Sequence, residues 1–61
     1  MMTVEELNRI KPDSVKFITL FGDTTTKESR NYKTLSKYMN REVVSWRILG
    51  EEMVVFVRGE L

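Results

Sequence analysis

Apolar residues recur most regularly between residues 42 and 58, where they occupy every second position on both sides of Gly50 and Glu51. A two-residue turn at these positions pairs Leu49 with Glu52, and glycine first in the turn suits a type II′ turn with positive φ. Alternation of side chains along each strand then gathers an apolar set on one face. That set is Val44, Trp46, Ile48, Met53, Val55 and Val57. The pattern therefore predicts a β-hairpin with one fully apolar face, in which Val44 lies opposite Val57.

The opposite face of the same hairpin is also rich in apolar residues. It combines four large apolar side chains with polar ones, namely Val43, Leu49, Val54 and Phe56 among Ser45, Arg47, Glu52 and Arg58. A face exposed to water does not require four such groups, so either a helix or a partner protein covers them. We keep both interpretations open, and we select Leu49, Val54 and Phe56 as the contact surface, with Arg47 and Arg58 at its rim.

The N-terminal residues show the pattern of a short amphipathic helix. Thr3 and Glu6 have the spacing of a capping box, in which each side chain binds the backbone N–H of the other residue. Val4, Leu7 and Ile10 follow at spacings of three, which places them in one apolar stripe. Pro12 ends the helix, because the residue before a proline avoids the α conformation. So short a helix must pack on the sheet to be stable.

Residues 15–21 form the second predicted strand. Val15, Phe17, Thr19 and Phe21 point to one side of it, and Lys16, Ile18 and Leu20 point to the other. Because both sides are mainly apolar, we expect a central strand or one that is covered on both faces.

Residues 24–34 are rich in threonine and charge, and two interpretations remain. A second capping box at Thr25 and Glu28 would begin a helix that reaches Met39. The alternative is a polar loop, with an edge strand at 30–34, followed by a short helix. Because residues 27–31 contain no apolar side chain and several poor helix formers, we favour the short helix, at residues 35–39.

Taken together, these elements predict a single small domain over residues 1–61. The fold class is α+β, with a short N-terminal helix, a mainly antiparallel sheet of three to four strands ending in a β-hairpin, and one short helix before the hairpin. The chain is too short for a large core, so a second subunit would help to complete it.

The net charge is only +1, but the basic residues concentrate in the middle of the chain. Residues 15–47 carry seven Lys and Arg against three Asp and Glu, a local charge of +4. Five of the seven basic residues are spaced by three or four positions: Lys27, Arg30, Lys33, Lys37 and Arg41. If residues 26–41 were one helix, these five would share a face that could meet nucleic-acid phosphates. A solvated helix face is the simpler interpretation.

The residue types available leave little for catalysis. The chain has no histidine and no cysteine, so the commonest general base and the commonest thiol nucleophile are missing. Its acidic residues follow no metal-binding loop pattern. We expect no enzyme, no cofactor and no metal.

The remaining composition bears on location. With 41% hydrophobic residues the chain is foldable, and it has no apolar run long enough to span a membrane. The acidic, amphipathic N-terminus is unlike a signal peptide. We therefore expect a cytoplasmic protein.

These observations favour a protein-interaction module of unknown biological process. We expect its partner to be a second copy, giving a homodimer or small homo-oligomer, or a larger protein that it modulates. Its size is typical of proteins encoded by phages and mobile elements. The alternative is a nucleic-acid-binding accessory protein that uses the basic residues between 27 and 41.

Overall fold

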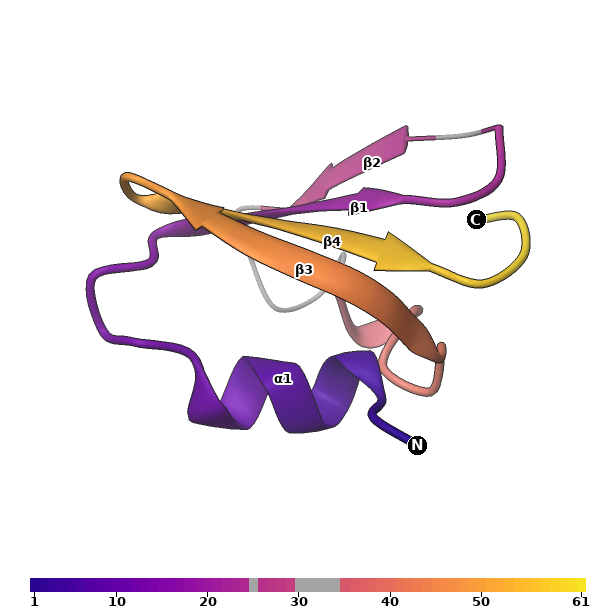
Figure 1. Cartoon of the computed structure of the whole chain (residues 1–61), viewed down its shortest axis with the longest axis horizontal. Coiled ribbons are helices and arrows are strands. Elements are labelled where there is room, and N and C mark those ends of the chain that lie inside the picture. The colour runs from indigo at the N-terminus through magenta and orange to yellow at the C-terminus, as the bar shows by residue number, and fades with distance from the viewer. Residues whose placement is uncertain (25, 30–34) are drawn as a thin grey trace.

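The computed structural model describes residues 1–24 and 35–61, together with the backbone of residues 26–29 (Figure 1). One helix and four strands follow in the order α1 (Val4–Ile10), β1 (Phe17–Phe21), β2 (Thr26–Ser29), β3 (Val43–Leu49) and β4 (Glu52–Val57). The predicted mixed α+β fold is confirmed. Figure 1 shows two layers, with the sheet on one side and α1 lying along the other.

The strand order across the sheet is β2-β1-β4-β3. β1 pairs antiparallel with β2, and β4 pairs antiparallel with β3, but β1 and β4 run parallel to each other. Two of the three pairings are therefore antiparallel, and the parallel pairing of β1 with β4, which was not predicted, makes the sheet mixed. The interior strands are β1 and β4, and both carry buried side chains. β1 is central, as its two apolar sides predicted.

The hairpin keeps the predicted register from the turn as far as Ser45. Leu49 pairs with Glu52 and Trp46 with Val55, and Gly50 has the positive φ of 63° that the turn requires. Beyond Ser45 the prediction is wrong, because a β-bulge shifts the register and Val43, in place of Val44, lies opposite Val57. The extra residue reverses the sides that follow it, so Val43 packs against the core and Val44 is exposed.

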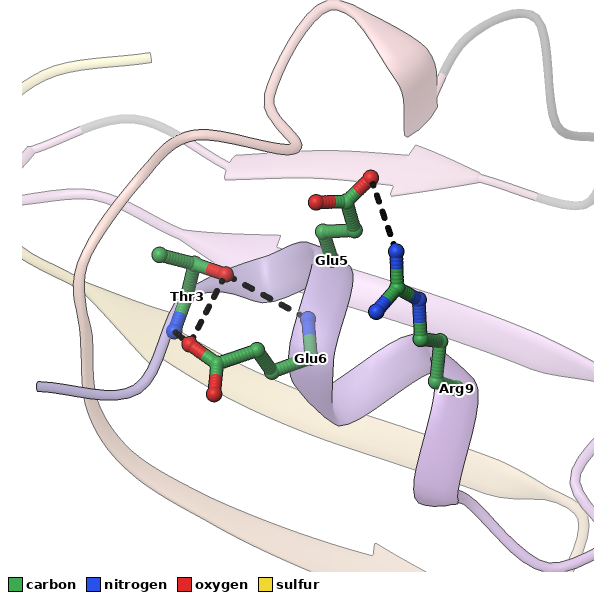
Figure 2. A network of polar contacts seen from close by, with 4 residues as sticks. All are labelled: Thr3, Glu5, Glu6 and Arg9. Carbon is green, nitrogen blue, oxygen red and sulfur yellow. Dashed lines mark hydrogen bonds and ion pairs between the residues drawn. The ribbon is translucent and has the colours of Figure 1, made fainter.

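Helix α1 begins with the predicted capping box (Figure 2). The Glu6 backbone N–H donates to the Thr3 hydroxyl, and the Glu6 carboxylate accepts from the Thr3 backbone N–H at 3.1 Å. An exposed ion pair between Glu5 and Arg9 follows one turn later at 3.7 Å. The helix ends at Ile10, and Lys11, which precedes Pro12, already has an extended conformation. Local sequence signals therefore set both ends of this helix.

Residues 35–41 hold the start of α1 in place. Two N–H groups of its first turn have no partner within a helix, and they donate instead to the loop: Val4 to the Arg41 carbonyl and Glu5 to the Met39 carbonyl, each at 3.0 Å. Leu35, at the beginning of this segment, is buried in the hydrophobic core. Helical geometry covers only residues 35 and 36, and turns occupy 37–40, so the helix predicted for 35–39 is shorter within the described residues.

The hydrophobic core lies between α1 and the sheet. Its buried members come from the helix, the loops and the two interior strands: Val4, Leu7, Val15, Ile18, Leu20, Leu35, Met53, Val55 and Val57. Ile10 was expected in this set, but it is the last residue of α1 and is 65% exposed. Val15 is buried here too, but it precedes β1 and so was wrongly placed in a strand.

Among the described residues, no helix combines the length and apolar character needed to cross a membrane.

Candidate protein-interaction surface

We call the side of the sheet that faces away from α1 the open face. The strand registers define its members in three neighbouring strands: Phe17, Thr19 and Phe21 of β1, Glu52, Val54 and Phe56 of β4, and Ser45, Arg47 and Leu49 of β3. Figure 1 shows α1 on the other side of the sheet and no described helix or strand over this one. The sequence left open whether the N-terminal helix or a partner protein covers this face of the hairpin. The N-terminal helix is therefore ruled out.

Two aromatic rings form one end of the open face. Phe21 and Phe56 are paired across β1 and β4, and their ring centroids lie 5.2 Å apart with the planes inclined by 21°. This stacked arrangement is favourable for aromatic side chains beyond the area that it buries. Phe56 nevertheless remains 43% exposed. Stacking therefore presents one rigid apolar surface to the solvent.

Leu49 and Val54 extend this apolar surface across the hairpin. Leu49 lies at the end of β3 and is 55% exposed, and Val54 in β4 is partly buried. Val54 pairs with Thr19 in β1 and with Arg47 in β3. Together with Phe21 and Phe56, these side chains form an apolar patch across three neighbouring strands, as a contact surface requires.

A polar pair lies in the middle of the open face. The Thr19 hydroxyl donates to the Glu52 carboxylate at 2.5 Å, although the two residues are far apart in sequence. Thr19 is 5% exposed and is the buried polar residue of the described chain. A buried hydroxyl needs such a partner, and the carboxylate supplies it without burying an unpaired charge. The pair leaves no buried group of the open face, as far as the structure describes it, unsatisfied.

The two arginines selected for the rim differ in their surroundings. Arg47 is exposed on the open face, opposite Val54. Arg58 follows β4, and its side chain forms an ion pair with Glu42 at 3.2 Å while remaining 70% exposed. The backbone strengthens this link, because the Arg58 N–H donates to the Glu42 carbonyl at 3.0 Å. Arg47 is therefore available to a partner, whereas Arg58 first has to leave Glu42.

All five residues selected from the sequence for this surface lie in or next to the hairpin strands, and four of them, Arg47, Leu49, Val54 and Phe56, share the open face. Sequence reasoning left out the β1 contribution, although it placed Phe17, Thr19 and Phe21 on one side of their strand. The missing information was the parallel pairing with β4, which brings that side next to Val54 and Phe56.

The basic residues between 27 and 41 do not share a helix. Residues 26–29 form β2 at the edge of the sheet, so the longer helix is wrong, and Lys27 belongs to a strand. Lys37 lies in the turns that follow Leu35, and the Arg41 carbonyl binds α1. Arg30 and Lys33, with the edge strand considered for 30–34, fall outside the described residues. The helical stripe that supported nucleic-acid binding is therefore lost.

In the part of the chain that the structure describes, no three acidic, histidine or cysteine side chains lie around a common point that could hold a metal ion. Comparisons of the chain with protein-family models, with curated proteins and with solved structures find no match.

Proposed function

We propose that the protein is a non-enzymatic protein-interaction module that binds through the open face of its sheet. The partner is a second copy, in a small homo-oligomer, or a larger protein that the module modulates. The observation that carries this proposal is the stacked Phe21–Phe56 pair, in which Phe56 is 43% exposed, continued by Val54 and Leu49. In so small a chain, an apolar patch without a described helix over it is typical of an interface.

The chemistry of the patch matches interfaces in general. Aromatic residues and arginine are enriched at protein contacts, and the fully buried centre of a contact contains few charges. Phe21 and Phe56 would form such an anchor, and Arg47 would lie on its rim. Glu52 lies opposite Leu49 at the turn end of the patch, and its carboxylate already accepts a hydrogen bond from Thr19. This hydrogen bond lowers the cost of removing water from the carboxylate.

The proposal is tested by photo-crosslinking from the open face in cells. Phe56 is replaced by p-benzoylphenylalanine, which keeps an aromatic ring at this position in an interior strand. The control carries the same photoreactive residue in place of Ile10, which is also exposed but lies on α1. We expect irradiation to give a covalent protein adduct from position 56, identified by mass spectrometry as a second chain or a larger protein, and no adduct from position 10.

A second change makes the result specific. Leu49→Asp in the photoreactive protein puts a charge beside the patch and should reduce the adduct strongly, because burying that charge in an apolar contact is costly. Equal adduct yields from positions 56 and 10, or none from position 56, would refute the assignment of the open face as the contact surface.

A further inference from the structure

The two edges of the sheet differ in how well they resist pairing with another strand. β2 has four residues, and its sequence includes Lys27 and Glu28, so this edge is short and charged. β3 has seven residues, contains no proline, and carries Arg47 as its one charged side chain. Short edges and charged edges are the usual protection against sheet extension. By these criteria β2 is protected and β3 is not.

The backbone of β3 has hydrogen-bonding groups directed at this edge. Leu49 and Glu52 flank a two-residue turn and therefore form a hydrogen-bonded pair, and such pairs alternate along an antiparallel ladder. The N–H and C=O groups of Arg47 thus point at β4, and those of Trp46 and Ile48 point away from it. Among the described residues, no backbone hydrogen bond outside the hairpin reaches Trp46 or Ile48.

The beginning of the same edge already accepts an added segment. The Val43 N–H donates to the Met2 carbonyl at 2.8 Å, and Thr3 forms an antiparallel bridge with Glu42. The N-terminal residues therefore pair with the edge up to the β-bulge and stop there. The part of β3 after Val43 remains open to a second strand, and it includes exposed apolar side chains, with Val44 at 57% and Trp46 at 46%.

We infer that two copies of the chain join along this open edge, with β3 of one copy antiparallel to β3 of the other about a two-fold axis at Trp46. The inference rests on the proposed function, because it names the second copy as a partner, but it uses the edge of the sheet and not the open face. The result is one continuous sheet of eight strands, twice the four of a single chain.

Charge and strand length select this register. The backbone groups directed at the open edge are those of Trp46 and Ile48. For these groups to pair with each other across the two copies, the axis must pass through Trp46, Arg47 or Ile48. An axis at Arg47 would put two like charges directly opposite each other, which is unfavourable. An axis at Ile48 would place Trp46 against the turn residue Gly50 and shorten the ladder. With the axis at Trp46, Arg47 lies opposite Ser45 of the second copy and Ile48 lies opposite Val44. Leu49 of the second copy then lies opposite Val43, so it takes the place of Met2 beside that residue.

The two-fold axis also determines on which side of the joined sheet the helices and the open faces lie. A two-fold axis perpendicular to the sheet keeps both α1 helices on one side and both open faces on the other. The two Trp46 side chains then lie next to each other on the helix side, because Trp46 shares the side of its paired residue Val55, which is buried in the core. The open faces form one wider surface, which remains accessible to a further partner.

Amide hydrogen exchange measured by NMR tests this pairing on the unmodified protein. At millimolar concentration the N–H groups of Trp46 and Ile48 should exchange slowly, and dilution into the micromolar range should restore fast exchange. The N–H of Arg47 is the internal control, because its partner is in β4 and its protection should not depend on dilution. Trp46 and Ile48 amides that exchange without protection at millimolar concentration would overturn the inference.

A charge at the axis provides the second test. Trp46→Glu brings two carboxylates together at the two-fold axis and should give a monomer by sedimentation velocity, under conditions where the wild-type protein has twice its 7.2 kDa chain mass. The monomer should keep its fold, because Trp46 is half exposed, and circular dichroism verifies this. Trp46→Tyr keeps a flat side chain and should remain a dimer.

Phe56→Asp separates this inference from the proposed function. If Trp46→Glu is a monomer and Phe56→Asp remains a dimer, the edge joins the two copies. If Phe56→Asp is a folded monomer and Trp46→Glu remains a dimer, the copies meet through the open face, so the edge inference is wrong and the proposed function stands. A wild-type protein that is monomeric at all concentrations overturns the edge pairing but not binding of a larger protein through the open face.

Single cysteines test the register, since the natural chain has none. Ser45→Cys and Arg47→Cys proteins should form a disulfide when the two are mixed and oxidised, because these positions lie opposite each other across the axis, at a separation that suits a disulfide. Each variant alone should form little. Efficient crosslinking of Arg47→Cys alone would mean an axis at Arg47 and would refute the axis at Trp46.

Discussion

The two faces of this sheet are built from the same interior strands, but α1 covers only one of them. β1 contributes Ile18 and Leu20 to the helix side and Phe17 and Phe21 to the open side, so both faces carry large apolar groups. The difference arises outside the sheet, where α1 packs against one face with Val4 and Leu7. Alternation of apolar residues along a strand therefore predicts that one face of the strand is buried. It does not tell whether a helix of the same chain or another molecule provides the cover.

The comparison is tested most strongly by removing the same side-chain atoms from each face. Leu20 is fully buried at 0% exposure, and Leu49 on the open face is 55% exposed. Leu20→Ala should lower the free energy of unfolding by roughly 2–5 kcal/mol, because it leaves a cavity in the core. Leu49→Ala should cost less than about 1 kcal/mol in the monomer, since an exposed side chain leaves no cavity. Urea unfolding at low protein concentration measures both, and equal losses would mean that the open face is part of the core.

Features that depend on neighbouring residues could be predicted from the sequence. The capping box at Thr3, the end of α1 before Pro12 and the turn at Gly50 all involve residues close together in the chain. The hairpin register followed from that turn, because a two-residue connection leaves little freedom in the pairing of Leu49 with Glu52. The predicted register is wrong at Val43, because the β-bulge inserts one residue there without a clear signal in the sequence.

Features that depend on distant segments could not be predicted in the same way. The parallel pairing of β1 with β4 brings Phe21 next to Phe56, and no local pattern specifies it. The face of the sheet on which α1 packs could not be predicted either, because both faces of the hairpin carry apolar side chains. β2 was missed since Thr26–Ser29 contains no apolar residue, and its position depends on pairing with β1. The candidate site was therefore predicted in part: its residues in β3 and β4 were found, and its residues in β1 were not.

Destabilising helix α1 without changing the sheet should lower the free energy of unfolding by a smaller amount. Thr3→Ala removes the hydroxyl that accepts from the Glu6 backbone N–H at the start of α1. The loss of such a cap costs about 1 kcal/mol of unfolding free energy. Thr3→Ser keeps the hydroxyl and should unfold at nearly the wild-type urea concentration. If Thr3→Ala is also unchanged, the carbonyls of Met39 and Arg41 are sufficient to hold the first turn of the helix.

The smallest change in stability is expected for a substitution at the end of α1, where the helix no longer packs against the sheet. Ile10 continues the apolar stripe in the sequence but is 65% exposed, so Ile10→Gln should change the unfolding free energy by less than about 0.5 kcal/mol. Leu7→Gln is the matched change one turn earlier, and it buries an amide at a position that is 1% exposed, at a cost of roughly 1–3 kcal/mol or more. Similar thermal unfolding of both variants would contradict this picture. If the difference holds, α1 covers its side of the sheet through Val4 and Leu7, and Ile10 adds nothing to that contact.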